Sequence, residues 1–308
     1  MQKQPVASIV NFCTNESRFL QACLEQSALF SAQLIVPVCD HFFDGTPENR
    51  SLLEQIYEAF PECLFIEYPF VEKLIPKRIW KKMDPAHFWH SLSRLIGYHF
   101  LDEEIDSVLF LDADEVPDGR RMAEWLECSD YHHHTAMKLA NYWYFRDPSN
   151  QSLQFEDSIV LAQKRALSPD LILSEQERDA IYDELPAPKR RNVTGVDGTP
   201  MFHHYSWVRT EEEMLKKVMA WSHKGDRNWI DLVKEEFKRP FSGTDFVHGY
   251  TYKKIEPPFD IRLQEFRFEK KGRANVRRLN GKEVMQWIKV RSPLWDWFAD
   301  TFFGSNKS

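Results

Sequence analysis

The stretch SVLFLDADEVPDG, residues 107–119, is the part of the sequence that decides the fold prediction. It opens with a short apolar run, and a cluster of carboxylates follows directly after it. An apolar run that ends in turn-forming residues is typical of a strand buried in a parallel sheet. Three similar runs precede it, at 7–12, 33–39 and 63–68, with helical patterns between them. This alternation predicts an α/β fold with a mostly parallel central sheet flanked by helices.

The composition is that of a soluble globular protein. Of the 308 residues, 43% are apolar and 28% are charged, and 40 Lys and Arg against 47 Asp and Glu give a net charge of −7. Such a chain is poorly suited to neutralise many phosphates, so we expect no nucleic-acid partner. The five cysteines never show CxxC spacing, which argues against a zinc ribbon and favours a reducing compartment. No stretch approaches the ~20 apolar residues that cross a bilayer, so we expect a cytoplasmic protein.

The regularity of the pattern changes along the chain. Residues 1–130 carry the strand–helix alternation, and one helix is expected to begin at Thr46 and Pro47. Residues 131–260 form an elaborated second half of the same domain, with strands at 135–145 and 158–164, a loop or lid at 168–200, and a capping box at 210–213 that begins a helix. Residues 261–308 form a basic, aromatic extension that also allows peripheral contact with the inner membrane face.

The carboxylates at the end of the fourth apolar run carry the clearest chemical signal. Asp112 and Asp114 stand one residue apart where a strand ends, so both can reach one hard cation such as Mg²⁺ or Mn²⁺. The alternative is an ordinary surface turn, because Asp is common after strands. Asp40 ends the second run in the same way, before the turn residues Asp44 and Gly45. In parallel sheets these strand ends meet at one edge, where ligands bind.

Four motifs occur in a fixed order over about residues 6–125. Asn15-Glu16 follow the first strand, and Asp40 stands four residues before Asp44-Gly45-Thr46; Ser93-Arg94-Leu95-Ile96-Gly97 precede the strand that ends in Asp112-Ala-Asp114. In this order they resemble the nucleotide-sugar glycosyltransferases of the GT-A fold, family 2-like. The Asp-Ala-Asp-Glu-Val-Pro form and the His-Tyr-Ser-Trp string at 204–207 also resemble family 17. The Gln-x-x-Arg-Trp signature of processive synthases is missing, which favours transfer of a single sugar.

The resemblance implies a metal-dependent, inverting hexosyltransferase that uses a nucleoside diphosphate sugar, with a UDP-sugar favoured. The acceptor would be a glycan or a lipid-linked hydroxyl in bacterial surface glycan synthesis. It implies donor contacts from Asn15, Glu16, Asp40, Arg94, Asp112, Ala113, Arg209, Lys216 and Lys217. Mn²⁺ or Mg²⁺ would be held by Asp112, Asp114 and either His204 or His203. The general base would be Asp157 first and Glu156 second, with Asp197 and Asp245 as further candidates.

Two other functions remain open from the sequence. A haloacid dehalogenase-like phosphatase also carries a strand ending in Asp-x-Asp, and Asp112 would then be its nucleophile. A non-catalytic nucleotide-sugar-binding module would keep the fold without turnover. The aromatic run at 141–146 forms either a sugar-stacking wall or part of the core. The aromatic residues at 295–303 either rest on an anionic membrane or pack back on the domain, and the three histidines at 132–134 are a weaker candidate for a metal site.

Overall fold

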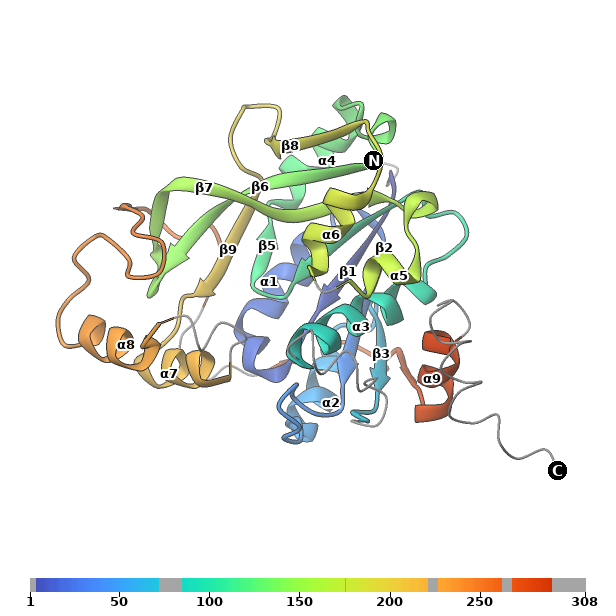
Figure 1. Ribbon diagram of the computed structural model, residues 1–308, viewed down its shortest axis with the longest axis horizontal. Helices are drawn as coiled ribbons and strands as arrows, with labels where there is room; N and C mark the ends of the chain where they lie inside the picture. The colour runs from blue at the N-terminus through green and yellow to red at the C-terminus, as the bar shows by residue number, and fades with distance from the viewer. Residues whose placement is uncertain (1–3, 72–84, 175, 221–226, 262–267, 290–308) are drawn as a thin grey trace.

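The computed structural model describes residues 4–71, 85–174, 176–220, 227–261 and 268–289, and an eleven-stranded sheet runs through them (Figure 1). The strand order is β11-β3-β2-β1-β4-β7-β6-β9-β5, with β10 beside β7 and β8 beside β6. The strands are β1 Gln4–Asn11, β2 Ser31–Cys39, β3 Leu64–Tyr68, β4 Ser107–Asp112, β5 Glu115–Pro117, β6 Ala136–Phe145, β7 Asp147–Gln163, β8 Lys189–Val193, β9 Phe202–Trp207, β10 Tyr252–Lys254 and β11 Val276–Arg278.

The half of the sheet built from β11, β3, β2, β1 and β4 is parallel throughout. Asn11 at the end of β1 pairs with Asp112 at the end of β4, so the carboxyl ends of these strands meet at one edge. The long strand β7 then runs antiparallel to both β4 and β6. The predicted α/β fold with a mostly parallel central sheet is confirmed, and so are the four N-terminal strands.

Helices cover both faces of the sheet. They are α1 Ser17–Ser27, α2 Arg50–Ala59, α3 Pro85–His99, α4 Gly119–Cys128, α5 Pro169–Ile172, α6 Glu177–Glu184, α7 Glu211–Ala220, α8 Trp229–Phe237 and α9 Gly281–Lys289, with short 3₁₀ turns at η1 Thr14–Glu16, η3 Tyr131–His133 and η4 Lys164–Ala166. Helices α1, α2 and α4 pack on one face, and α3, α5, α6 and α9 pack on the other.

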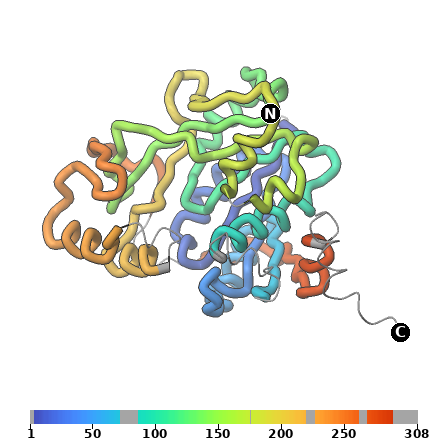
Figure 2. Tube along the Cα trace, viewed as in Figure 1, coloured from blue at the N-terminus to red at the C-terminus, as the bar shows by residue number. Residues whose placement is uncertain are grey.

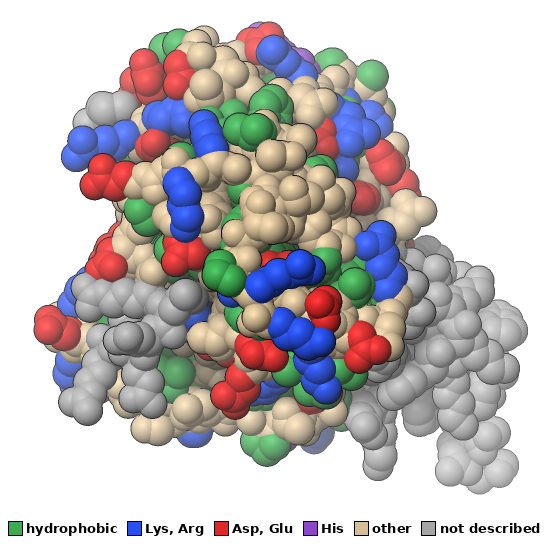
Figure 3. Space-filling view, turned by 90° about the vertical axis from the view of Figure 1, so that its left-hand side faces the viewer, with side chains coloured by type: hydrophobic (Ala, Val, Ile, Leu, Met, Phe, Trp, Pro, Cys, Tyr) green, Lys and Arg blue, Asp and Glu red, His purple; other side chains and the backbone are tan. Residues whose placement is uncertain are grey.

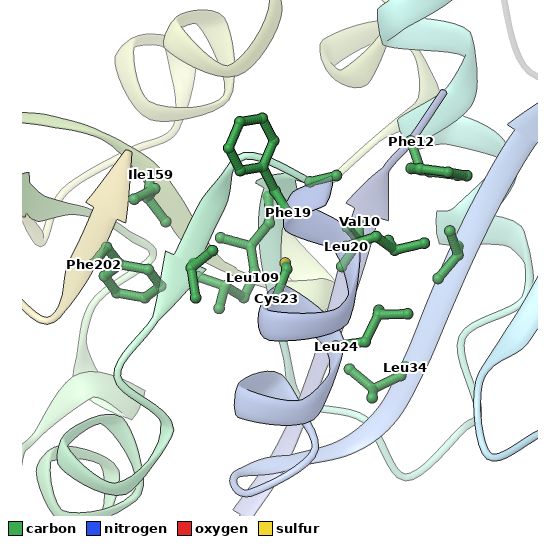
Figure 4. Close-up of a cluster of buried hydrophobic side chains, with 14 of the residues drawn as sticks. Val10, Phe12, Phe19, Leu20, Cys23, Leu24, Leu34, Leu109, Ile159 and Phe202 are labelled. Atoms are coloured by element: carbon green, nitrogen blue, oxygen red, sulfur yellow. The ribbon is translucent and has the colours of Figure 1, made fainter. Parts of the chain in front are cut away.

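The inner side of α1 shows why this sequence forms that layer. Phe19, Leu20, Cys23 and Leu24 recur at helical spacing and are fully or almost fully buried. Figure 4 shows Cys23 beside Leu109 and Leu24 beside Leu34, both apolar side chains of the neighbouring strands. Burying such side chains contributes about 1.5–3 kcal/mol each, which holds the helix on the sheet.

The second half of the chain extends this core. A further apolar cluster, containing Trp143 and Trp207, lies between the sheet and the paired helices α7 and α8. Figure 2 shows the C-terminal segment returning to the N-terminal half, where β11 pairs in parallel with β3. The side of the molecule seen in Figure 3 carries Lys and Arg side chains interspersed with Asp and Glu. Within the ranges given above, no helix is long and apolar enough to cross a membrane.

Two details of the sequence interpretation differ from the structure. The helix expected at Thr46 and Pro47 begins at Arg50 instead, and the side chain of Asn49 caps it by accepting a hydrogen bond from the Leu52 N–H at 3.1 Å. Thr46 is held in the preceding turn, where its hydroxyl donates to Asp44. The described residues of the segment at 168–200 include α5, α6 and β8, so this segment is not one long loop.

Gly97 is required where α3 crosses the sheet. A Cβ at this position would lie 2.6 Å from Cγ2 of Ile9 and 3.1 Å from Cγ of Pro37. We expect Gly97→Ala to lower the free energy of unfolding by about 1–3 kcal/mol, as overpacking does in other cores. Chemical denaturation measures this change. Gly281→Ala is the control, because its Cβ would meet Val71 at an ordinary 3.6 Å; equal stability of both variants would contradict the prediction.

Candidate functional site

Asp112 stands at the end of β4 between two arginines. Its Oδ1 lies 3.2 Å from Nη2 of Arg94 on α3, and its Oδ2 lies 3.3 Å from Nη2 of Arg178 on α6. Burial acts to raise the pKa of Asp112, but the charges of Arg178 and Arg94 hold it well below the usual range. Both oxygens of this carboxylate are therefore already engaged by cations of the protein.

Arg178 also holds the turn that carries the two aspartates. It forms a two-pronged ion pair with Glu115, which is completely buried, and its Nη2 lies 2.8 Å from Oε1. Glu115 further accepts hydrogen bonds from the Ser158 hydroxyl at 3.1 Å and from the Asp112 N–H at 2.8 Å. The sequence analysis missed this pairing, because Arg178 lies on α6 and no motif connects it to Glu115.

Asp114 is the unsatisfied carboxylate of the site. It is 6% exposed, and no hydrogen bond from the described residues reaches its side chain. Its oxygens lie 3.7 Å from Nε2 of His204 and 4.0 Å from Nη2 of Arg209. Burial, followed by the neighbouring charge of Glu16, raises the pKa of Asp114 to about 6. A buried carboxylate that lacks hydrogen bonds is costly, so this position is suited to an added cation.

Positively charged side chains reach this region from the loop before α7 and from the second half of that helix. Arg209 is buried and donates two hydrogen bonds to Glu16, at 2.6 and 2.7 Å. Lys217 donates to the Ser206 hydroxyl at 2.9 Å, and burial together with the charge of Arg209 lowers its pKa. Lys216 donates to Asn15 at 3.2 Å. The structure thus brings together two sets of expected donor residues that are about 200 positions apart in the chain.

The two adjacent histidines of β9 have different surroundings. His204 lies by Asp114, and its ring packs edge-on against Trp143 with the centroids 4.6 Å apart. His203 instead lies 2.7 Å from the Tyr144 hydroxyl through Nδ1, and burial lowers its pKa to about 3. His204 is accordingly the one of the pair that the structure places beside the carboxylate.

The carboxylates of the four candidate bases also differ in their hydrogen-bond partners. Both oxygens of Asp157 bond to Arg191 at 2.9 Å, and Asp197 bonds to Arg121 and to Thr199. Asp245 is buried and accepts several backbone N–H groups of its own loop. Glu156 is partly exposed, and its Oε1 accepts a hydrogen bond from the Tyr250 hydroxyl at 3.0 Å.

Trp143 connects the two sides of this site. Its ring lies edge-on to His204 on one side and to His248 on the other, with centroids 4.9 Å apart in the second pair. Nε2 of His248 is 3.8 Å from Oε1 of Glu156. The rings of His204, Trp143 and His248 therefore form a continuous series of contacts between Asp114 and Glu156. Trp143 itself is buried, so the aromatic run at 141–146 contributes to the core at this position.

The remaining expected residues have other surroundings. Oδ1 of Asp40 accepts the Phe70 N–H at 2.7 Å and lies 2.6 Å from Nδ1 of His41. Ala113 is buried, and its N–H donates to the Asn11 carbonyl at 3.0 Å. His132 and His133 are exposed, while the aromatic residues at 295–303 lie outside the described residues.

Glu48 is a further buried carboxylate that the sequence analysis missed. It accepts the Thr14 N–H at 3.1 Å and the Asn49 N–H at 3.2 Å, and burial raises its pKa. It thereby holds the start of η1, which carries Asn15 and Glu16, against the loop after β2. No pattern in the sequence distinguishes Glu48 from a solvated residue at the start of a helix.

The side chains around Asp114 fit a divalent cation only in part. No group of three His, Cys, Asp or Glu side chains suited to a metal occurs in the described part of the chain. Asp114 and His204 nevertheless fit as two ligands, because no hydrogen bond from the described residues reaches the carboxylate and the imidazole nitrogen is close to it. Asp112 fits less well, since Arg94 and Arg178 engage both of its oxygens.

No protein-family model and no curated protein matches the chain. The solved glycosyltransferase GlyE of Streptococcus pneumoniae TIGR4 aligns with 77% of this chain and 64% of its own, at 12% identity and a TM-score of 0.39. S. aureus TarS 1–349 aligns over 77% and 72%, at 10% identity and a TM-score of 0.39. Mycobacterium tuberculosis glucosyl-3-phosphoglycerate synthase, solved with Mn²⁺, UDP and phosphoglyceric acid, aligns over 84% and 88%, at 12% identity and a TM-score of 0.35. This chain thus spans less than two thirds of GlyE, and similarity at this level does not assign it to a family.

Proposed function

We propose that this protein is a glycosyltransferase that moves one sugar from a nucleoside diphosphate sugar, with a UDP-sugar favoured, to an acceptor hydroxyl. One observation carries the proposal. Asp114 is a buried carboxylate without a hydrogen-bond donor, set beside His204, Arg209 and Lys217 at the edge where the parallel strands end. Such an edge is where ligands bind in open α/β sheets, and the local charges suit a cation together with a diphosphate.

Each group has a role in this proposal. Asp114 and His204 would hold Mn²⁺ or Mg²⁺, which supplies charge neutralisation to the departing diphosphate when it is bound. Arg209 and Lys217 lie on the same side and offset the rest of that charge, which is electrostatic stabilisation of the leaving group. Asp112 acts indirectly, because Arg94 and Arg178 hold it in an ion-pair network that orients the turn.

The acceptor side of the proposed site is the region of Glu156. An inverting transferase needs a base that takes the proton of the acceptor hydroxyl as the sugar is attacked. Glu156 is partly exposed and connected through His248, Trp143 and His204 to the Asp114 side. Asp157 is tied to Arg191 by both oxygens, so we assign the base to Glu156.

The phosphatase hypothesis gains no support from the site. It requires Asp112 to attack phosphorus as a nucleophile. The two guanidinium groups on this carboxylate stabilise its charge and reduce its tendency to attack. A role in bacterial surface glycan synthesis, with a glycan or lipid-linked acceptor, remains part of the transferase proposal.

Binding of the leaving group tests the proposal directly. The melting temperature of the protein is measured with UDP, GDP, CDP and ADP, each with and without Mn²⁺. We expect the melting temperature to increase with one diphosphate when Mn²⁺ is present. We also expect the protein to release that diphosphate slowly from the corresponding nucleoside diphosphate sugar. Binding without any release would indicate a non-catalytic binding module, and no increase with any diphosphate would overturn the proposal.

Lys217→Met tests the cationic side of the site. We expect the Kd for the stabilising diphosphate to rise about 10–100-fold, because a charged hydrogen bond contributes about 1.5–3 kcal/mol. Isothermal titration calorimetry gives the value. Lys234→Met is the control, since Lys234 is an exposed lysine on α8 outside the site. An unchanged Kd in Lys217→Met would remove Lys217 from the donor site.

A further inference from the structure

The loop between residues 244 and 251 is organised around one buried carboxylate. Oδ1 of Asp245 accepts the N–H groups of Val247 at 2.7 Å and His248 at 2.6 Å, and its Oδ2 accepts the Tyr250 N–H at 3.1 Å. The Tyr252 hydroxyl adds a hydrogen bond to Oδ2 at 2.8 Å. Asp245 is 4% exposed, so these bonds are shielded from water and set the conformation of the loop.

This loop presents two side chains to Glu156. The rings of His248 and Tyr250 stack with centroids 5.0 Å apart and an angle of 20° between their planes. The Tyr250 hydroxyl donates to Oε1 of Glu156 at 3.0 Å, and Nε2 of His248 lies 3.8 Å from the same oxygen. Among the residues that the structure describes, none forms a hydrogen bond or ion pair with Oε2.

We propose that Tyr250 is a positioning residue: it ties Oε1 of Glu156 so that Oε2 is the atom that accepts the acceptor's proton, and Asp245 fixes the loop that holds Tyr250 in place. This inference rests on the proposed transferase function. A hydrogen bond to one oxygen removes a rotational freedom of the carboxylate, and a base held in one geometry reacts faster than a mobile one. His248 supports the arrangement by stacking on the Tyr250 ring.

The proton and electron balance of the step is simple. The O–H bond of the acceptor breaks and its proton goes to Oε2 of Glu156. The electron pair left on the acceptor oxygen forms the new bond to C1 of the sugar. The bond from C1 to the phosphate oxygen breaks, and its electron pair leaves with the nucleoside diphosphate. No oxidant, reductant or further reactant is required.

The raised pKa of Tyr250 is consistent with its role as a donor. Burial, followed by the charge of Glu156 and the hydrogen bond to it, raises the pKa of Tyr250 to about 12. The phenol therefore keeps its proton at neutral pH and continues to donate to Oε1. Asp157, the neighbouring carboxylate, has no comparable arrangement, because Arg191 engages both of its oxygens.

A double-mutant cycle on kcat tests the inference. Tyr250→Phe keeps the ring and removes the hydroxyl, and Glu156→Gln removes the base. The assay measures release of diphosphate from UDP-glucose, GDP-mannose, CDP-glucose and ADP-glucose in the presence of Mn²⁺, with water as the acceptor. Tyr131→Phe is the matched control, since Tyr131 is a buried tyrosine on η3 outside the site.

We expect Tyr250→Phe to lower kcat about 10-fold with the KM for the donor unchanged, and Glu156→Gln to lower kcat about 100-fold or more. Adding Tyr250→Phe to Glu156→Gln should have no further effect, because the tyrosine acts through the glutamate. Effects that multiply in the double variant, or a normal kcat in Tyr250→Phe, overturn the inference while the transferase function stands. Absence of release by the wild-type protein from all four donors overturns the proposed function and this inference with it.

Discussion

Asp114→Asn is expected to abolish diphosphate release while making the protein more stable. The substitution removes the charge of a buried carboxylate that receives no hydrogen bond from the described residues, and with it the proposed cation ligand. We expect kcat to fall about 100–1000-fold, as when a group that stabilises the charge of the transition state is lost. At pH 7 and in EDTA, we expect the free energy of unfolding to rise by about 1–2 kcal/mol, because the cost of ionising a buried group disappears.

The pH dependence of this stability difference has a defined sign. The pKa of Asp114 is raised to about 6 in the folded protein, above that of an ordinary Asp. The folded state therefore binds the proton more tightly, and stability is lost as the pH rises from about 4 to about 6. The increase in the free energy of unfolding caused by Asp114→Asn should be complete above about pH 6 and absent below about pH 4. Urea denaturation at several pH values measures this increase.

Asp118→Asn is the control for both measurements. Asp118 caps α4 by accepting a hydrogen bond from the Arg121 N–H, and Asn is an equally good cap. We expect normal activity and stability in this variant. Retained release of diphosphate in Asp114→Asn, with Asp118→Asn also normal, would exclude Asp114 from the chemistry.

Arg178→Met is expected to have the largest effect on stability. It leaves Glu115 charged and completely buried without its ion-pair partner, a situation that costs about 3–5 kcal/mol. It also removes one of the two cations on Asp112, so the turn that carries Asp114 loses its support. Thermal and urea denaturation should both show the lower stability of the Arg178→Met protein.

Two further variants test whether the unpaired charge of Glu115, and not a general disruption of the fold, causes the loss of stability. Arg191→Met removes an ion pair that is half exposed, with Asp157 as the partner, and should cost at most about 1 kcal/mol. Adding Glu115→Gln to Arg178→Met neutralises the stranded charge and should recover a large part of the lost stability. If Glu115→Gln made the Arg178→Met protein less stable still, the unpaired charge would not be the cause.

The strands were predictable because they depend on short stretches of sequence, and so was the position of Asp112 and Asp114 where the fourth strand ends. The predicted strands at 7–12, 33–39, 63–68 and 107–114 overlap β1–β4, since a strand buried on both faces needs apolar side chains on both. The capping box at 210–213 begins α7, and its hydrogen bonds join Thr210 to Glu213, three residues away. The helix expected at Thr46 was placed too early because Asp44 binds the threonine in a turn.

Which residues form the site depends on contacts between elements that are far apart in the sequence. The spacing of residues along the chain does not predict such contacts. The sequence by itself determined an α/β sheet whose strand ends carry Asp40, Asp112 and Asp114, because apolar periodicity and turn residues act locally. Only the tertiary structure decided that Arg178 from α6 holds Asp112 and Glu115, and that Arg209 meets Glu16. Long-range pairs form when separate elements pack, so which charges meet is set by the three-dimensional arrangement of the elements.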